Sequence, residues 1–393
     1  MADLKFETIH EASKPHEFQR SLAEIFPGSR RKLSLETTRL SAPTCHWAVY
    51  QWGPQRLTFK SFFEESDFDQ YVGQLDRYYP QQLNDLDHPR GGFVLLPELN
   101  GIVWSFPFDP AMPGLHYSAN VDWVASVLGE KSEIVPKIVN YTPEVGSVLS
   151  YRVAGERQTL AYGKVTPHNV AGLQWLIMQR LWCSPAREAG VLNVAQPLAF
   201  RPEAGLLLQS AVPGKPIPAD RNRTPFLDLV DQAGATLAAV HGADIPFGSE
   251  RSLESLVEHV RKAMEDLKFM APRLYPEVRK FLNQVEDRAG RSRPSPLVPS
   301  HGDYKYDQLL YSRGTYSLID FEMFCQAEPA LDLGTFCAYL PPSVAEDWRD
   351  GAATETLRTS FLASYENSTG EPIDLDRLAL YESAMLALRG LSY

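Results

Sequence analysis

The chain contains 393 residues, more than a single hydrophobic core usually organises, so two or three domains are expected. Hydrophobic residues make up 44% of it and charged residues 22%, as in globular proteins, while the formal net charge of −11 argues against a nucleic-acid-binding protein, which needs clustered Lys and Arg. The apolar runs are too short to span a bilayer and residues 1–19 contain no signal-peptide core, so we expect a cytoplasmic protein with no membrane partner.

The first part of the chain, residues 1–135, has the patterns of a mixed α/β domain. Short β-rich runs are joined by turn signals such as Gly53-Pro54, and a stretch of helical spacing separates them. The expected elements are a helix over Phe18–Phe26, strands over His46–Trp52 and Arg56–Phe63, a helix over Phe68–Tyr79, strands over Phe93–Leu96 and Gly101–Phe106, and a helix over Val121–Leu128.

Residues 136–212 repeat a β-rich pattern, and residues 213–393 are dominated by helical periodicity. The Pro213–Pro216 segment separates the two regions. In the first region we expect strands over Ser147–Val153 and Thr159–Val165, a helix over Asn169–Trp182, and strands over Leu198–Arg201 and Leu206–Ser210. In the second we expect helices over Phe226–His241, Leu253–Met270, Tyr275–Ala289 and Asp374–Leu391. The first of these is expected to place one apolar stripe on a single face, made of Leu227, Val230, Ala233, Leu237 and Val240.

A weak internal repeat links the first two regions. Each contains a hairpin, a lysine-bearing strand, a helix and two further strands before a Pro-rich break, with Lys60 in the first copy and Lys164 in the second. A duplicated small lobe would explain this order. The general abundance of ββα units would explain it equally, so both interpretations stay open.

The most informative motif lies between Ser300 and Glu322. His301-Gly302-Asp303 enters a short strand, Gln308 follows, and Asp320 closes the next strand after a turn at Ser312–Gly314. Alone, His-Gly-Asp is a common turn tripeptide. Together, the residues supply what phosphoryl transfer needs, namely a base that orients a hydroxyl and ligands for the magnesium that bridges the phosphates. The spacing predicts an ATP-dependent kinase of a small molecule.

Residues 136–393 resemble the aminoglycoside phosphotransferase and choline kinase-like family. The resemblance implies a protein-kinase-like bilobal α+β fold, with a β-rich N-lobe over 136–212 and a helical C-lobe over 213–393 that holds the catalytic loop and the acceptor site. Residues 1–135 would be a cap domain or a degenerate duplicated N-lobe. The segments that carry the resemblance are His301-Gly302-Asp303, Ile319-Asp320-Phe321-Glu322, Glu328-Pro329-Ala330-Leu331-Asp332-Leu333, Leu206–Pro216 and Gly234–His241.

Carried onto this sequence, the family pattern assigns roles to the motif residues. Asp303 would be the catalytic base, and Asp320 would bind Mg²⁺ together with Gln308, which stands where the family has Asn. Lys305 would meet the γ-phosphate or would be an ordinary solvent-facing lysine. The resemblance also implies that Asp332 accepts backbone N–H groups of the His301 loop.

The same resemblance implies a nucleotide site for ATP, with GTP not excluded. Lys164 would pair the α- and β-phosphates, and the turn at Gly155 would cover a phosphate. The backbone of Gln209 and Ala211 would hold the adenine edge. The helix after Lys164 contains no Glu or Asp, so the usual glutamate would have to be replaced by Gln174 or Gln179, or by Glu188 in the loop that we expect after the helix.

Further scaffold and substrate residues are less sharply defined by the sequence. The resemblance makes His301 a scaffold residue and places Glu322 behind Asp320. An acceptor subsite would draw on later acidic or aromatic residues, which nothing in their spacing separates from ordinary surface residues. These are Glu328, Asp347, Trp348, Tyr365 and Glu382.

The leading functional hypothesis is an O-phosphotransferase that uses a hydroxyl of a sugar, an aminoglycoside or an amino alcohol as acceptor. A nucleotide-binding pseudokinase that serves as a binding or regulatory module is the alternative, motivated by Gln308 and by the missing helix carboxylate. AMP transfer or protein phosphorylation is a third hypothesis. The sequence fixes neither the acceptor nor the oligomeric state.

Overall fold

The computed structural model describes residues 20, 22, 31–41, 44–79, 81, 83–88, 90–167, 170–216, 224–340 and 351–391. The chain forms two compact units, one containing residues 1–171 and 199–206 and the other containing residues 172–198 and 207–393. The helix expected over Phe18–Phe26 lies almost entirely outside the described residues.

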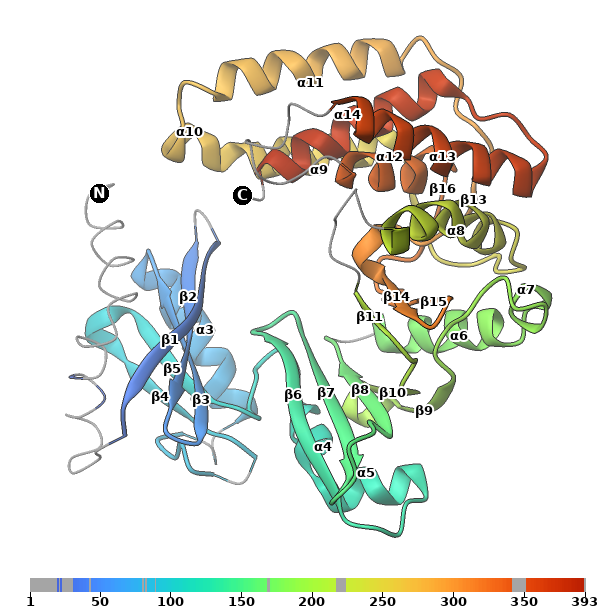
Figure 1. Ribbon diagram of the computed structural model, residues 1–393. Coiled ribbons are helices and arrows are strands. Elements are labelled where there is room, and N and C mark those ends of the chain that lie inside the picture. Colours follow the sequence, from blue (N-terminus) through green and yellow to red (C-terminus); the bar gives the residue numbers. More distant parts are fainter. Residues whose placement is uncertain are drawn as a thin grey trace. The chain divides into compact units, whose positions relative to one another are not determined.

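An antiparallel five-stranded sheet with the order β1-β2-β3-β5-β4 forms the first part of the first unit. Figure 1 shows helix α3 alongside this sheet. The predicted hairpin at Gly53-Pro54 and the predicted hairpin before Gly101 are confirmed. The elements are β1 (Leu33–Ser41), β2 (Cys45–Trp52), β3 (Gln55–Phe62), α3 (Glu65–Tyr78), β4 (Phe93–Leu96), the 3₁₀ turn η2 (Pro97–Leu99) and β5 (Gly101–Ser105).

Both faces of this sheet are covered by apolar side chains. On one face, Phe68 and Leu75 of α3 pack with Ile102 and Trp104. On the other, a second cluster includes Tyr50, Leu57 and Phe59. Strand β2 is consequently buried along nearly its whole length, which is why its sequence is a continuous apolar run and not an alternating one.

A second five-stranded sheet has the order β6-β7-β8-β10-β9, which is the strand order of the first sheet. The first strand of each sheet has a register irregularity, between Leu35 and Thr37 and between Ile138 and Asn140. In each sheet a helix follows the third strand, and a 3₁₀ turn joins the last two. The elements are β6 (Ile134–Thr142), β7 (Gly146–Val153), β8 (Ala161–Val165), α6 (Val170–Trp182), β9 (Pro197–Arg201), η3 (Pro202–Ala204) and β10 (Leu206–Ser210).

Two short helices, α4 (Leu115–Ala119) and α5 (Val121–Leu128), lie between the two sheets in sequence. The side chain of Asn120 caps α5 by accepting the Trp123 N–H at 3.0 Å, and Gly129 ends the helix in the left-handed conformation. Strands β1 and β6 were not predicted. Both are edge strands; the side chains of β1 are mostly exposed, and those of β6 are a mixture of buried, half-buried and exposed residues without regular alternation, so neither leaves a clear periodic pattern in the sequence.

Helices dominate the second unit, and four of them, α9, α11, α12 and α14, enclose one apolar core (Figure 1). Helix α8 packs on α13, where a Cβ at Gly234 would lie 2.6 Å from the Phe361 carbonyl oxygen. The helices are α7 (Pro185–Glu188), α8 (Thr224–His241), α9 (Leu253–Ala263), η4 (Met264–Asp266), α10 (Leu267–Met270), α11 (Tyr275–Ala289), α12 (Ala330–Tyr339), α13 (Gly351–Thr369) and α14 (Leu375–Leu391).

The predicted helical stripe of α8 is confirmed for Val230, Ala233, Leu237 and Val240, which are all buried. Leu227, which the pattern placed on the same face, is 43% exposed, so that part of the prediction is wrong. The single helix predicted over Leu253–Met270 is interrupted by the 3₁₀ segment η4.

Two three-stranded sheets hold the motif region, with the orders β11-β14-β15 and β12-β16-β13. The β14–β15 hairpin turns at Arg313 and Gly314, which both have positive φ, as the favoured two-residue hairpin turn requires. Residues 301–308 join β13 to β14, and residues 319–324 join β15 to β16. The elements are β11 (Lys215–Pro216), β12 (Ser249–Arg251), β13 (Val298–Ser300), η5 (Tyr306–Gln308), β14 (Leu309–Ser312), β15 (Thr315–Leu318) and β16 (Cys325–Ala327).

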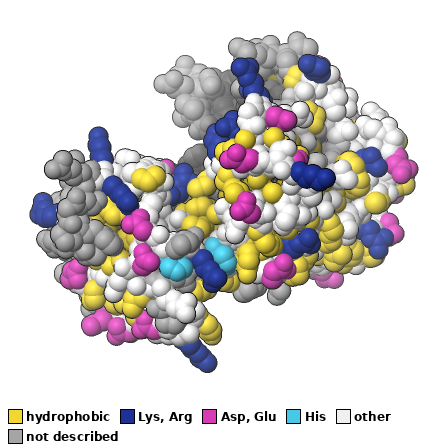
Figure 2. All heavy atoms as spheres, turned by 90° about the horizontal axis from the view of Figure 1, so that it is seen from below, with side chains coloured by type: hydrophobic (Ala, Val, Ile, Leu, Met, Phe, Trp, Pro, Cys, Tyr) yellow, Lys and Arg dark blue, Asp and Glu magenta, His cyan; other side chains and the backbone are white. Residues whose placement is uncertain are grey.

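Among the described residues, no helix combines the length and the apolar character needed to cross a membrane. The four cysteines, Cys45, Cys183, Cys325 and Cys337, are free thiols. On the face shown in Figure 2, the basic and acidic side chains of the described residues are interspersed and form no broad basic patch.

Candidate active site

The His301 loop is held by a single buried carboxylate. Asp332, near the start of α12, is fully buried and accepts the backbone N–H groups of His301 at 2.7 Å and Gly302 at 2.8 Å. Its Oδ2 also lies 3.2 Å from Nε2 of His241. Burial acts to raise the pKa of Asp332, but the hydrogen bond and the charge of His241, with further contributions from His301 and the Gly302 N–H, lower it below its usual value. The predicted anchoring role of Asp332 is confirmed.

Gly302 is required by the shape of the same loop. Its φ is +82°, and a Cβ placed on it would lie 1.9 Å from the carbonyl oxygen of Met323. Arg251 of β12 donates from Nη1 to the Gly302 carbonyl at 3.1 Å. The residue before Asp303 is therefore fixed from both sides, and the direction of the Asp303 backbone is fixed with it.

Two buried rings connect the loop to its surroundings. His301 is fully buried, and its Nε2 donates to the carbonyl of Ile319 at 3.0 Å, so that it links the two halves of the motif. Its Nδ1 is buried without a hydrogen-bond partner. Tyr304, also fully buried, donates to the carbonyl of Ala233 in α8 at 2.7 Å. His301 has no contact with solvent, which fits the scaffold role.

Asp303 and Lys305 form an ion pair at the exposed side of this loop. Nζ of Lys305 lies 2.9 Å from Oδ2 of Asp303, and the two side chains are 16% and 31% exposed. Burial raises the pKa of Asp303, while the charge of Lys305 opposes the shift and the carboxylate of Asp320 adds to it. Burial acts to lower the pKa of Lys305, but Asp303 more than offsets this and raises it. Lys305 is therefore paired with Asp303 and is not an ordinary solvent-facing lysine.

Gln308 and Asp320 lie at the same end of the β14–β15 hairpin. Leu309 is paired with Leu318, and the Ile319 N–H donates to the Gln308 carbonyl at 3.0 Å, so Asp320 directly follows the residue that faces Gln308. Asp320 has a φ of +69°, which is uncommon for a residue other than glycine. Backbone conformations of this kind are concentrated at functional sites.

The residues present suit a magnesium ion. Mg²⁺ prefers oxygen ligands and is usually held by one or two carboxylates together with substrate phosphates. Asp320 and Gln308 offer a carboxylate and an amide oxygen at the same end of the β14–β15 hairpin. Among the described residues no three His, Cys, Asp or Glu side chains form a metal-binding cluster. A metal bound largely through phosphate does not require such a cluster.

The predicted nucleotide-binding residues belong to different parts of the fold. Lys164 is half-buried on β8, the third strand of the second sheet, and Gly155 is in the β7–β8 turn with a φ of +83°. Gln209 and Ala211 are at and just beyond the end of β10 in the second unit. Ser210 between them is fixed by backbone hydrogen bonding to Gln196, at 2.8 Å.

Gln174 and Gln179, the two glutamines considered as substitutes for the helix glutamate, differ in burial. Gln174 in α6 is 3% exposed, and both polar atoms of its amide are buried without a hydrogen-bond partner. Gln179 is exposed. A buried, unsatisfied amide is costly, so Gln174 is the residue of the two that calls for a functional explanation.

The residues considered for an acceptor subsite are mostly structural. Glu328 is buried and accepts hydrogen bonds from the guanidinium of Arg377 and the hydroxyl of Tyr381. The hydroxyl of Tyr365 lies 2.8 Å from Nδ1 of His241. Glu382 is paired with Arg358 at 3.2 Å. Asp347 and Trp348 lie outside the described residues.

One cluster in the first unit was missed by the sequence analysis. Lys60, the counterpart of Lys164 in the repeat, is 7% exposed, and its Nζ lies 2.6 Å from Oε2 of Glu144 in the β6–β7 turn. Tyr71 donates to Oε1 of Glu144 at 2.8 Å, and the Glu144 N–H donates to Asp109 at 2.9 Å. Lys60 and Glu144 are 84 residues apart in sequence, so no local pattern could have revealed the pair.

The fold and the His301 loop define a small-molecule kinase with a protein-kinase-like architecture. A family model described as "Phosphotransferase enzyme family" matches residues 172–380, which is 209 of the 393 residues. The chain belongs to this family, the aminoglycoside phosphotransferase and choline kinase-like enzymes. A search of curated proteins found no significant match.

Several solved structures are similar to this chain, and the first of those that follow reaches a TM-score of 0.50. A candidate aminoglycoside phosphotransferase from Ralstonia eutropha JMP134 has 17% identity and a TM-score of 0.50, covering 69% of this chain and 86% of its own. Choline kinase from Cryptosporidium parvum Iowa II has 14% identity and a TM-score of 0.48, covering 66% and 82%. An aminoglycoside phosphotransferase from Streptomyces rimosus, in complex with ADP and streptomycin, has 20% identity and a TM-score of 0.45, covering 70% and 98%. The predicted protein-kinase-like fold is confirmed.

Proposed function

We propose that this enzyme transfers the γ-phosphate of ATP to a hydroxyl group of a small molecule, with Asp303 as the catalytic base. The observation that carries the proposal is the Asp303–Lys305 ion pair on a loop fixed by Asp332, with the Asp320 carboxylate close enough to raise the pKa of Asp303. A base, a cation and a second carboxylate are thereby gathered on one rigid segment.

Asp303 would accept a hydrogen bond from the acceptor hydroxyl and orient it for attack. A carboxylate whose pKa is raised is a better proton acceptor, and Lys305 keeps it ionised by opposing the effect of burial. The Lys305 ammonium would also stabilise negative charge on the phosphoryl group during transfer. Because His301 and Tyr304 are buried, neither is assigned a direct role in proton transfer.

Asp320 and Gln308 would hold Mg²⁺, which when bound neutralises charge on the β- and γ-phosphates. Gln308 has one more methylene than the family's Asn, so its amide must be positioned by the backbone. The hydrogen bond between the Ile319 N–H and the Gln308 carbonyl provides that constraint. The left-handed conformation of Asp320 sets the direction in which its side chain leaves the strand end.

For the nucleotide, we assign Lys164 to the α- and β-phosphates, Gly155 to a phosphate-covering turn, and the backbone of Gln209 and Ala211 to the base. These assignments rest on family resemblance and on the position of Lys164 on the third strand of its sheet, where kinases carry this lysine. We assign residues 136–212 to the N-lobe because the second sheet runs from Ile134 to Ser210. Residues 213–393 would form the C-lobe and residues 1–135 the cap.

The acceptor class that we propose is a sugar, an aminoglycoside or an amino alcohol. Purified protein with Mg²⁺ and ATP should release ADP in the presence of one member of such a panel. Asp303→Asn should reduce turnover by about 10³-fold, because the base is lost while the size of the side chain is kept. Asp287→Asn, at an exposed site on α11, is the matched control and should leave turnover unchanged.

Two results would contradict the proposal. Undiminished turnover of Asp303→Asn would remove Asp303 from the role of base. Nucleotide binding without turnover on any acceptor, with Mg²⁺ present, would favour the nucleotide-binding module instead. GTP in place of ATP in the same assay tests the choice of nucleotide.

A further inference from the structure

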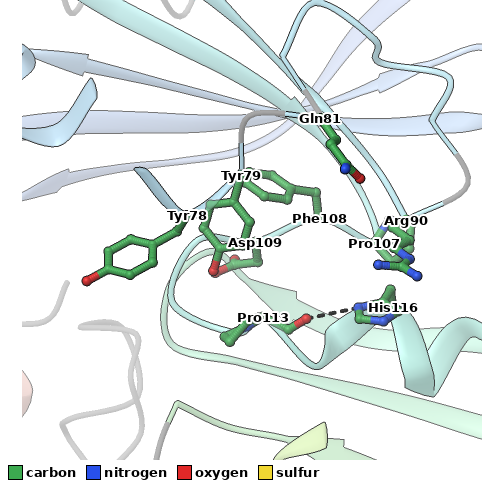
Figure 3. Close-up of a pocket in the computed structure, with 9 residues that line it drawn as sticks. All are labelled: Tyr78, Tyr79, Gln81, Arg90, Pro107, Phe108, Asp109, Pro113 and His116. Carbon is green, nitrogen blue, oxygen red and sulfur yellow. Dashed lines mark hydrogen bonds between the residues drawn. The ribbon is translucent and has the colours of Figure 1, made fainter. Parts of the chain in front are cut away.

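A pocket lies in the first unit, outside the region that matches the phosphotransferase family. It has a cavity volume of about 330 Å³, which falls within the range of roughly 300–1,000 Å³ typical of small-molecule sites. Figure 3 shows its lining, which combines aromatic walls with a basic end and a buried carboxylate. The lining residues used below are Tyr79, Arg90, Phe108, Asp109 and His116.

The aromatic walls are firmly packed. Tyr79 follows the end of α3 and meets Phe108 edge-to-face, with ring centroids 5.0 Å apart. Phe108 stacks in turn on Phe93 of β4, at 5.4 Å. Gly91 allows the close approach of the two pocket segments, since a Cβ there would lie 2.3 Å from the Phe108 nitrogen. The walls are therefore formed before any ligand arrives, which lowers the cost of binding.

The basic end of the pocket is formed by Arg90 and His116. The guanidinium of Arg90 makes no hydrogen bond or ion pair with any residue in the described part of the chain. In Figure 3 it lies close to the His116 ring. Nδ1 of His116 donates to the Pro113 carbonyl at 2.9 Å, so Nε2 of the neutral ring is an acceptor that is available to a ligand. Burial lowers the pKa of His116, and the charge of Arg90 lowers it further, which keeps the ring neutral near pH 7.

Asp109 places a hydrogen-bond-accepting carboxylate on another part of the pocket wall. It is 1% exposed, and its oxygens accept from the Tyr141 hydroxyl at 2.9 Å and from the backbone N–H groups of Ala111 and Glu144 at 3.0 and 2.9 Å. The carboxylate is thus rigidly held, and carboxylate oxygens have capacity for a further donor. Figure 3 shows Asp109 across the pocket from Arg90 and His116.

We propose that this pocket binds a small hydroxylated anion of the sugar phosphate or sugar acid class. The oxyanion would lie against the Arg90 guanidinium and form charge-assisted hydrogen bonds with it. One hydroxyl of the ligand would donate to Nε2 of His116 and another to Asp109, and the C–H face of its ring would contact Tyr79 and Phe108. A neutral sugar lacks the interaction with Arg90, and inorganic phosphate lacks the ring contact.

The experiment is isothermal titration calorimetry of the full chain with glucose 6-phosphate, glucuronate, inorganic phosphate and glucose. At least one of the two hydroxylated anions should bind about tenfold or more tightly than glucose and than inorganic phosphate, the difference expected for one charge-assisted contact. The glucose 6-phosphate and glucuronate titrations separately identify a phosphate or a carboxylate as the preferred anion.

Variants assign the binding to this pocket. Arg90→Gln should weaken binding by about tenfold, and His116→Gln should also weaken it. Arg152→Gln, at an exposed arginine on β7 that does not line the pocket, is the control and should leave affinity unchanged. Asp303→Asn should also leave the affinity for the hydroxylated anion unchanged, because the pocket is distinct from the proposed active site.

Three results would overturn the proposal. These are the absence of binding by both hydroxylated anions, binding that survives both Arg90→Gln and His116→Gln, and binding of inorganic phosphate or glucose as tight as that of the tighter-binding hydroxylated anion. Because the readout is binding and not turnover, the outcome does not depend on the proposed catalytic roles.

Discussion

The two five-stranded sheets have the same strand order and the same connections, but their lysines differ. Lys164, on the third strand of the second sheet, is half-buried, whereas Lys60, on the third strand of the first, is almost completely buried against Glu144 and lies 4.4 Å from the ring centre of Tyr71. Lys60 is buried between Glu144 and the Tyr71 ring, so little of its ammonium group is exposed to a nucleotide phosphate. The strand order of a kinase N-lobe is therefore compatible with a purely structural sheet.

The shared topology favours duplication over the chance recurrence of ββα units. Three further features occur in both sheets. Each sheet has a register irregularity in its first strand, a helix after its third strand, and a 3₁₀ turn between its fourth and fifth strands along the chain. The turn ends with Asn100 in the left-handed conformation in the first sheet and with Gly205 in the second. Chance recurrence would have to reproduce each of these features.

The largest expected effect concerns Lys164. Lys164→Met should reduce kcat by about 10²-fold and raise the KM for ATP, because it removes a charge that would stabilise the phosphates. Lys137→Met, at an exposed lysine on the edge strand β6 of the same sheet, should change neither parameter. Steady-state kinetics measures both. Lys60→Met should leave the KM for ATP unchanged. If Lys60→Met and Lys164→Met reduced kcat and raised the KM for ATP equally, the two lysines would not differ in function.

The next effect concerns the pH dependence of stability through Asp109. Burial, more than its other contacts, raises the pKa of Asp109 from 3.8 to about 6. Between these values the folded state holds a proton that the unfolded chain releases, so the stability contributed by this group is present at low pH and is lost as the pH rises from about 4 to 6. A shift of this size corresponds to about 2–3 kcal/mol.

Asp109→Asn should therefore flatten the dependence of unfolding free energy on pH between 4 and 7, measured by urea denaturation. The wild-type chain should lose stability in this window relative to the variant. Asp76→Asn, at an exposed site in α3, is the control and should keep the wild-type slope. Parallel curves for the wild type and Asp109→Asn would show that Asp109 titrates normally.

A third effect tests the Lys60–Glu144 pair directly. Lys60→Met should lower the free energy of unfolding by about 1–3 kcal/mol, because it leaves a carboxylate without its partner at a mostly buried site. Glu144→Gln should cost less, since the amide can still accept from Tyr71. In the double variant the losses should be less than additive, and the coupling energy from urea unfolding measures the pair. Strict additivity would mean that the two side chains do not interact in solution.

Local signals in the sequence were sufficient for the hairpins and the catalytic loop. Gly53-Pro54 and Ser312–Gly314 mark turns that the structure contains, and His301-Gly302-Asp303 with Asp332 predicted an anchored loop that the structure confirms. In these cases the geometry is imposed by neighbouring residues, by glycine conformations, or by a motif that recurs in a family.

Other features depend on partners that are distant in sequence. The parallel pairing of β12 with β16 and the edge strands β1 and β6 produce little apolar periodicity, so they were not predicted. The burial of Lys60 depends on Glu144, and the role of Glu328 depends on Arg377. A charged residue that is destined for a buried ion pair has the same sequence signature as one at the surface.

The smallest effect compares the two 3₁₀ turns at equivalent positions of the sheets. Gly205 has a φ of +56°, and a Cβ there would lie 3.0 Å from the Thr166 carbonyl oxygen. Gly205→Asn should therefore lower the free energy of unfolding by about 1 kcal/mol, because the side chain adds both backbone strain and a tight contact.

Asn100 already occupies the left-handed region, with a φ of +43°. Asn100→Gly should change the unfolding free energy by less than about 0.5 kcal/mol, because relief of strain is offset by the greater freedom of glycine in the unfolded chain. Chemical denaturation of both variants measures the difference. If Asn100→Gly proved as costly as Gly205→Asn, the side chain of Asn100 would be making a contact of its own, and the two turns would no longer be equivalent copies.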